Sequence, residues 1–219
     1  MKKIDLNMER NANSIVGFRV VTTGGEIGKV DEFYFDDRTW TIRYAVVKME
    51  EWQRGRKVFI ATGALARNDG EQGVFFVPYT NDQILSSPVI DTDRPVSRRQ
   101  ESDLYWHFGG NRYWEGDSCG GALRSSQYMT GFHIHGTDGE FGSVCDLILD
   151  DETWKVLCLV VEIQRSKGGK KVLIPLGHLL EMRWGDAELY LDQTIADMDK
   201  SKVFEEERFA DPPLASNPD

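Results

Sequence analysis

The chain alternates between short hydrophobic runs and turns that contain glycine or aspartate. In residues 17–21 (GFRVV), apolar and polar side chains alternate, so that Phe18 and Val20 face the same way, as in a β-strand. Residues 40–49 (WTIRYAVVKM) and 154–163 (WKVLCLVVEI) are rich in β-branched and aromatic residues and are apolar on both faces. That composition is typical of a central strand in a closed or covered sheet.

The same hydrophobic pattern occurs twice. A shift of 114 positions aligns residues 17–84 with residues 131–198 without a gap, and 20 of the 68 pairs are identical. The identical positions are mainly glycines, turn aspartates and apolar strand residues, as a repeated supersecondary framework requires. Each copy predicts five or six short strands, followed by Thr80 or Thr194 at the start of a short helix. We therefore expect an all-β protein of two small barrels with little helix, because closure leaves no long sheet edge exposed.

The repeat also predicts the domain organisation. Residues 1–14 form an N-terminal arm, 15–85 the first barrel, 86–128 a linker and 129–200 the second barrel, and 201–219 form an acidic tail that we expect to be disordered.

The residue order G-F-x-V…G-G-E-I-G-x-V-x-x-F-x-F-D-D-x-x-W…I-R-Y-A-V-V…G-R-K-V-F-I resembles the PRC-barrel family, known from the cytoplasmic part of the photosynthetic reaction centre H subunit and from the C-terminal domain of a ribosome maturation factor. The linker stretch IDTDRPVSRRQESDLYWHFGGNRYW is similar to that of stand-alone bacterial proteins with two such barrels in tandem. The resemblance covers about residues 15–200. It implies barrels of about six strands that make protein contacts and carry no catalytic residues or cofactor. The H subunit's membrane helix and the maturation factor's RNA-processing domain have no counterpart here.

Charge narrows the choice of partner. The net charge is −10, and it is unevenly distributed. Residues 17–85 hold nine basic and ten acidic residues, whereas residues 131–199 hold six basic and thirteen acidic residues. Nucleic acid and anionic lipid are disfavoured, because phosphate binding depends on Lys and Arg. We expect a protein partner, and a basic one for the second barrel.

Targeting signals are absent from the sequence pattern. No apolar run approaches the roughly 18 residues that span a bilayer, and the opening MKKIDLNMERNANS lacks the apolar core of a signal peptide. We therefore expect a cytoplasmic protein with no integral membrane segment.

Two stretches imitate catalytic motifs. GGEIGKV lacks the GxxxxGK spacing and the Ser or Thr of a phosphate loop, and a hairpin turn explains it better. GDSCGG at 116–121 differs from a serine-protease motif at Cys119, and His107 is too near in sequence to complete a triad. The pairs Asp36-Asp37 and Asp150-Asp151 recur at the same turn, which favours turn chemistry over acid–base catalysis. We expect no catalytic residues.

Histidine and cysteine leave a metal- or thiol-dependent alternative open. His133 and His135 share one face of a predicted strand, but two ligands do not make a metal site, and a solvated barrel surface is the alternative. Cys119 lies among small polar residues as an exposed thiol or part of a glycine-rich loop, whereas Cys145 and Cys158 lie within apolar runs as buried thiols.

The linker is rich in aromatic residues. Its rings either pack between the barrels or form a surface for a partner; they are Tyr105, Trp106, Phe108, Tyr113 and Trp114. With His133 and His135, these side chains are the candidate interaction surface, and they would also allow a homo-oligomer. The basic residues Arg94, Arg98 and Arg99 lie among acidic ones, which indicates internal ion pairs.

Three functions fit these observations. The first is a non-enzymatic protein-interaction or scaffold module built from two barrels with diverged surface charge. The second is an accessory protein that tunes electron or proton transfer at a membrane redox complex, by analogy with the H subunit. The third is an activity at His133 and His135 or at Cys119.

Overall fold

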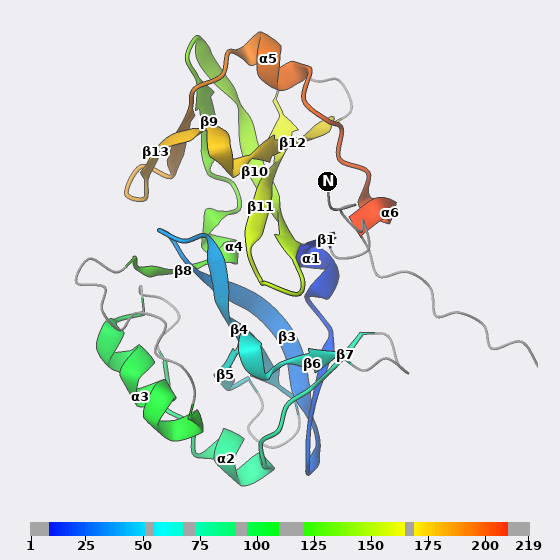
Figure 1. Ribbon diagram of the computed structural model, residues 1–219, viewed down its shortest axis with the longest axis vertical. Helices are drawn as coiled ribbons and strands as arrows, with labels where there is room; N and C mark the ends of the chain where they lie inside the picture. The colour runs from blue at the N-terminus through cyan, green and yellow to red at the C-terminus, as the bar shows by residue number, and fades with distance from the viewer. Residues whose placement is uncertain are drawn as a thin grey trace, which may run out of the picture. The chain divides into compact units, whose positions relative to one another are not determined.

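The computed structural model (Figure 1) describes residues 9–50, 55–67, 73–90, 96–109, 121–164 and 169–209. Within these residues the chain divides into two compact units. Residues 15–125 form the first unit, and residues 126–209 together with residues 9–14 form the second unit. Residues 9–14 are thus separated from the repeat that they precede in the sequence.

The first unit is built on one sheet. Its strands pair in the order β5–β4–β3–β2–β7–β6, and β8 pairs with β3 beside this path. Neighbouring strands are antiparallel, except that β2 and β7 are parallel. The elements are β2 (Arg19–Thr22), β3 (Gly25–Asp36), β4 (Thr41–Met49), β5 (Lys57–Ala61), the 3₁₀ turn η1 (Thr62–Ala64), β6 (Ala66–Arg67), β7 (Val74–Phe76), α2 (Asn81–Leu85), α3 (Arg98–Phe108) and β8 (Leu123–Ser125).

The second unit has the same order of equivalent strands. They pair as β12–β11–β10–β9–β14–β13, and β1 pairs with β10 beside this path. The elements are β1 (Glu9–Asn11), α1 (Ala12–Ile15), which runs on into the first unit, α4 (Ser126–Met129), β9 (His133–Gly136), β10 (Gly139–Asp150), β11 (Val156–Ile163), β12 (Lys171–Pro175), η2 (Leu176–His178), β13 (Leu179–Arg183), β14 (Glu188–Leu191), α5 (Ile195–Asp199) and α6 (Glu206–Phe209). Thr80 and Thr194 cap α2 and α5, as the sequence predicts.

The seventh strand of each sheet comes from the segment just before the other repeat. β8, which precedes the second repeat in the sequence, joins the sheet of the first unit, and β1, which precedes the first repeat, joins the sheet of the second unit. In the first unit, β4 pairs with one edge of β3, so β2 and β8 share the other edge. β8 pairs with Tyr34–Asp36, and in the second unit β1 pairs with the equivalent Ile148–Asp150. We call β1 and β8 the exchanged strands. The 114-residue shift places β1 opposite β8, so the two pairings have one register.

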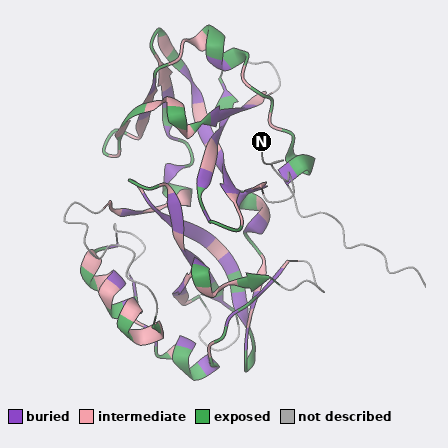
Figure 2. Ribbon diagram, viewed as in Figure 1, coloured by how far each residue is buried: buried purple, intermediate pink, exposed green. Residues whose placement is uncertain are grey.

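The central strands of the first unit are buried on both faces, as the sequence predicts (Figure 2). One face of β3, β4 and β5 is covered by later parts of the same unit. The covering cluster comprises Tyr34, Tyr44, Val46, Phe59, Ile90, Val96, Leu104 and Leu123, with Ala61 and Phe108 packed against it. α3 thus lies in the predicted linker as a covering helix, which the sequence analysis did not anticipate. It begins at a capping box formed by Ser97 and Gln100.

The equivalent face of the second unit is covered by a shorter segment. Phe209 of α6 packs on Ile148, Val160 and Leu173, and Phe204 lies beside it. These three sheet residues are the counterparts of Tyr34, Val46 and Phe59 under the 114-residue shift. The covered face explains why the central strands are apolar on both sides.

The expectation of an all-β fold in two domains is confirmed, but the expectation of closed barrels of about six strands is wrong. Among the described residues the terminal strands of each sheet, β5 and β6 or β12 and β13, do not pair, so each sheet is open. Each sheet also holds seven strands. The periodicity within one repeat accounts for six of them, and the seventh comes from outside the repeat. Covering segments, rather than barrel closure, bury the second face of the central strands.

The close pairing of β10 with β11 leads to a stability prediction. A Cβ added to Gly142 would lie 2.1 Å from the carbonyl oxygen of Glu162. Gly142→Ala must therefore push the two strands apart, and we expect the free energy of unfolding to fall by more than about 2 kcal/mol in denaturant titration. Gly177→Ala is the control, because no atom lies within 4 Å of its added Cβ, and it should change stability by less than about 0.5 kcal/mol. Equal stability of the two variants would contradict the pairing.

Candidate functional site

The first aspartate of each pair shapes a turn. Asp36 Oδ1 accepts hydrogen bonds from the backbone N–H groups of Arg38 (3.0 Å) and Thr39 (2.9 Å). Asp150 Oδ1 accepts the two equivalent bonds after β10, at 3.1 and 2.7 Å. The predicted turn role is confirmed for these two residues.

The second aspartate of each pair holds an exchanged strand. Asp151 Oδ2 accepts a hydrogen bond from Arg10 Nε of β1 at 3.2 Å, and Asp37 Oδ2 accepts one from Arg124 Nε of β8 at 3.0 Å. Asp37 Oδ1 also accepts a bond from the backbone N–H of Ala122 at 2.8 Å. Because Arg10 and Arg124 are equivalent under the 114-residue shift, the same ion pair anchors both strands.

The third residue of each exchanged strand contacts a buried carboxylate. Asn11 Nδ2 donates to Asp146 Oδ2 at 2.8 Å, and Ser125 Oγ donates to Glu32 Oε2. Asp146 and Glu32 each follow a register shift in the pairing of their strand with its neighbour. Such a bulge re-aims the side chain that follows it. Here it directs a carboxylate toward the exchanged strand.

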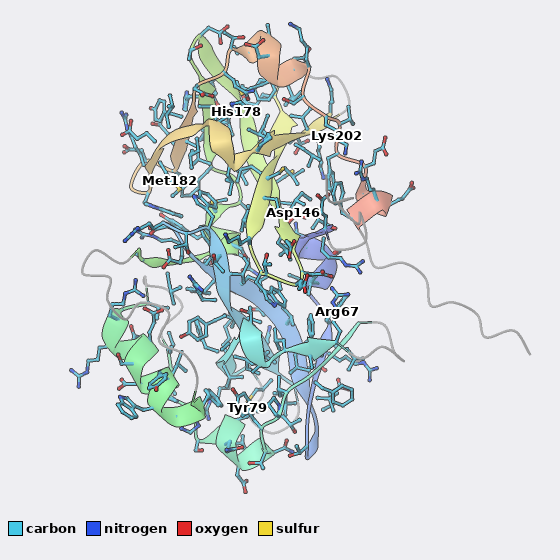
Figure 3. All side chains as sticks on the ribbon, viewed as in Figure 1. Arg67, Tyr79, Asp146, His178, Met182 and Lys202 are labelled. Carbon is cyan, nitrogen blue, oxygen red and sulfur yellow. The ribbon has the colours of Figure 1, made fainter. Side chains whose placement is uncertain are left out.

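The surroundings of these carboxylates shift two pKa values. Burial raises the pKa of Asp146, labelled in Figure 3, although the hydrogen bonds from Asn11 and from the backbone N–H groups of Leu147 and Asn13 oppose this effect. In the first unit, burial opposes the charge on Lys57, but its hydrogen bonds to Asp31 and Glu32 outweigh burial and raise its pKa.

An acidic cleft of about 620 Å³ lies on the second unit, where the β9–β10 turn meets the end of β11 and α5. It is lined by Asp138, Glu140, Phe141, Ile163, Ile195, Ala196 and Asp199. Phe141 and Ile163 are buried and form an apolar floor, whereas the three carboxylates are exposed at the rim. We call this site the acidic cleft. It can hold a side chain with an apolar stem and a positive end.

The rim carboxylates are fixed by hydrogen bonds. Glu140 Oε1 accepts bonds from His133 Nδ1 at 2.8 Å and from Gln164 Nε2 at 2.9 Å. The bond from His133 lowers the pKa of Glu140 below its usual value. Asp138 Oδ1 accepts a bond from the N–H of Ile195 at 2.7 Å.

Asp199 has a basic neighbour at the rim. Its Oδ1 lies 3.2 Å from Lys170 Nζ. The seven lining residues that the structure describes include three carboxylates and neither Lys nor Arg, so this lining is acidic.

The first unit has different residues at the equivalent position. Gly24 and Leu85 stand where the second repeat has Asp138 and Asp199. Asn81 replaces Ile195, and its side chain accepts a hydrogen bond from Thr22 Oγ1 and donates one to the carbonyl oxygen of Gly24 at 3.2 Å. Glu26 is the counterpart of Glu140 and Asp82 that of Ala196, so the first unit lacks two of the three rim carboxylates and has one acid elsewhere.

A second cleft, of about 670 Å³, lies on the first unit and has balanced charge. Its lining includes two lysines and two acidic residues. Lys29 pairs with Glu50 at 3.0 Å, and Asp31 pairs with Lys57 at 2.8 Å. Because the charges of its described lining balance, this cleft selects less strongly for a charged partner.

Comparison with known proteins identifies the first repeat. Residues 8–84 match the family model of the PRC-barrel domain. The first repeat is a PRC-barrel domain. A comparison with curated proteins gave no match. The matched residues include β1 as well as β2 to β7, so the PRC-barrel domain as a sequence unit contains the strand that the structure places on the second unit.

The linker aromatics divide between packing and exposure on α3, which lies beside the PRC-barrel sheet. The Phe108 ring centroid lies 4.7 Å from that of Tyr79, also labelled in Figure 3, and Phe108 packs on the covering cluster. Trp106 is 73% exposed, and its ring lies 5.3 Å from that of Tyr105. Tyr113 and Trp114 lie outside the described residues. The expected ion pairing is confirmed for Arg98, which bonds Glu101 at 2.6 Å.

The histidine pair lies in the other unit, on β9. His133 is hydrogen-bonded to Glu140, whereas the ring of His135 stacks on Tyr190 with centroids 5.0 Å apart. His135 Nε2 lies 3.6 Å from Glu188 Oε1. The two imidazoles therefore face different carboxylates. Within the described ranges, no three His, Cys, Asp or Glu side chains gather closely enough to hold a metal ion.

The two described cysteines are partly buried thiols. Burial raises the pKa of Cys145 to about 11 and also raises the pKa of Cys158. Both pack beside the apolar face of the second unit. Cys119 lies outside the described residues. As for membranes, no helix in the described part of the chain is long and apolar enough to cross one.

Neither the exchanged strands nor the acidic rim was predicted from the sequence. The signal for the strands was the match of Arg10 with Arg124, which extends the repeat past residue 17. The signal for the rim was the appearance of carboxylates at 138 and 199, where the first repeat has none. Both signals require the repeats to be compared position by position.

The raised pKa of Asp146 gives a pH prediction for Asp146→Asn. The new side chain keeps Oδ1 as an acceptor for the N–H groups of Leu147 and Asn13. Its NH2 group replaces Oδ2, which accepts from Asn11 Nδ2, so the Asn11 amide must turn over to present Oδ1, which has no hydrogen-bond partner among the described atoms, as the acceptor. Because the folded wild type binds this proton more tightly than the unfolded chain does, it gains stability from Asp146 as pH falls through the raised pKa toward about 3.9. At neutral pH the variant should be at least as stable as the wild type, and its advantage should shrink in acid.

Denaturant titrations of both proteins between about pH 8 and pH 4 measure this difference. The predicted environment of Asp146 is wrong if the variant is the less stable protein at neutral pH and gains on the wild type in acid.

Proposed function

We propose that the chain is a non-enzymatic protein-interaction module of two PRC-barrel units whose surfaces have diverged. In this proposal the acidic cleft of the second unit binds a Lys or Arg side chain of a partner protein. The observation that carries the proposal is the combination of an apolar floor, Phe141 and Ile163, with a rim of three carboxylates in one cleft.

The chemistry of the acidic cleft suits a long basic side chain. The methylene groups of Lys or Arg can cover Phe141 and Ile163, while the cation reaches Glu140 or Asp138. Glu140 supports this role because it is a carboxylate at neutral pH and its bonds to His133 and Gln164 hold it in place. A fixed carboxylate loses less conformational entropy on binding than a mobile one.

The contrast between the units supports a specific rather than a general role. The frame of strands is the same, yet the first unit has Gly24 and Leu85 in place of Asp138 and Asp199. The net charge of −10 also favours a protein partner over nucleic acid.

Peptide display tests this function on the full chain. A random heptapeptide library selected against the protein should enrich peptides with Lys or Arg beside an apolar residue. The double variant Asp138→Asn, Glu140→Gln keeps the hydrogen-bond acceptors of the rim but removes two charges, and it should bind the selected peptides about tenfold more weakly. Titration of labelled peptide gives the Kd, which should also rise with salt.

The matched control is Glu152→Gln, Asp186→Asn, which removes the same charge from two exposed residues of the second unit that lie outside the cleft lining. It should leave binding within about twofold of the wild type. The proposal fails if the enriched peptides lack basic residues, or if both double variants weaken binding equally.

A further inference from the structure

The two exchanged strands dock in one register on equivalent edges. Arg10 faces Leu149 and Arg124 faces the equivalent Phe35, and each arginine bonds the second aspartate of the following turn. The middle residue is Arg in both strands, and it bonds an Asp in both sites. This ion pair anchors a strand but cannot distinguish β1 from β8. Any selectivity must come from the residues on either side.

The third residue of each exchanged strand is matched in size to the carboxylate that it bonds. In the second unit a short acid, Asp146, meets a longer amide, Asn11, whereas in the first unit a longer acid, Glu32, meets the short hydroxyl of Ser125. Asp and Glu differ by one methylene, so placing Ser opposite Asp146 would leave a gap, and placing Asn opposite Glu32 would crowd the site. Asp146 and Glu32 are both buried, so a gap would leave polar atoms without hydrogen bonds.

The first residue of each exchanged strand is matched in polarity to its surroundings. Leu123 of β8 is buried in the cluster that covers the first unit and forms an isolated bridge with Val96. Its counterpart in β1 is Glu9, which is only partly buried. Moving β1 onto the first unit would place a carboxylate in an apolar cluster, which is strongly unfavourable.

We propose that each unit carries a strand-docking site that selects its own strand. Both sites require Arg at the middle position. The site on β10 takes a polar first residue and Asn at the third position, and the site on β3 takes an apolar first residue and Ser. The size-matched pairs Asn11–Asp146 and Ser125–Glu32 keep each first strand on the sheet of the other repeat.

A double-mutant cycle in the full-length chain tests the selectivity. Asn11→Ser and Asp146→Glu each create a mismatch, and each should speed hydrogen exchange of the backbone amides of β1 by about tenfold or more. The double variant recreates the Ser–Glu pair of the first unit, with Lys171 at the position of Lys57, and should return the exchange rates to within about threefold of the wild type.

Asn13→Ser is the matched control. The side chain of Asn13 is exposed, and only its backbone N–H contacts Asp146. It should show no rescue when combined with Asp146→Glu. The reciprocal cycle, Ser125→Asn with Glu32→Asp, should show the same compensation in the exchange of β8. If either double variant exchanges as fast as the product of its single effects, size matching does not select the strand and the proposal is overturned.

Discussion

The hydrogen bond between an arginine of a three-residue strand and the second aspartate of a turn is the interaction on which both units depend. It fixes β8 on β3 and β1 on β10, at the place where β2 and β9 leave the edge of the long strand unpaired. Without the added strand, the backbone groups of Tyr34–Asp36 and Ile148–Asp150 would lack partners in the middle of a buried sheet. The exchanged strands therefore complete the backbone hydrogen bonding of each sheet.

Because each sheet is completed by its exchanged strand, the surface residues of the two units can differ without loss of the fold. The strand order, the anchoring arginines and the turn aspartates agree between the units, while the residues around α2 and α5 differ. In one unit the Asn81 amide donates a hydrogen bond to the Gly24 carbonyl oxygen, and in the other three carboxylates surround an apolar floor. Function in this molecule is therefore best sought where the two repeats disagree.

The strands, turns and helix caps could be predicted from the sequence because they depend on local patterns: alternation in GFRVV, the aspartate before each turn, and Thr80 and Thr194 before a helix. The strand exchange could not be predicted, because β1 and β8 are too short to show a hydrophobic periodicity and their partner strands lie far away in sequence. The helix α3 was not predicted, because its segment was interpreted from its aromatic residues as a linker, although Ser97 and Gln100 carry a capping-box signature. The acidic rim was missed because its members are 61 positions apart, from Asp138 to Asp199, and only folding brings them to one cleft.

The most direct test of the strand exchange is a set of interproton nuclear Overhauser effects across the strand pairs of the full-length protein in solution. Cross-strand contacts between residues 9–11 and 148–150, together with contacts between 123–125 and 34–36, are the result that the structure predicts. Contacts of 9–11 with 34–36 and of 123–125 with 148–150 would show that each repeat keeps its own first strand, and would contradict the account.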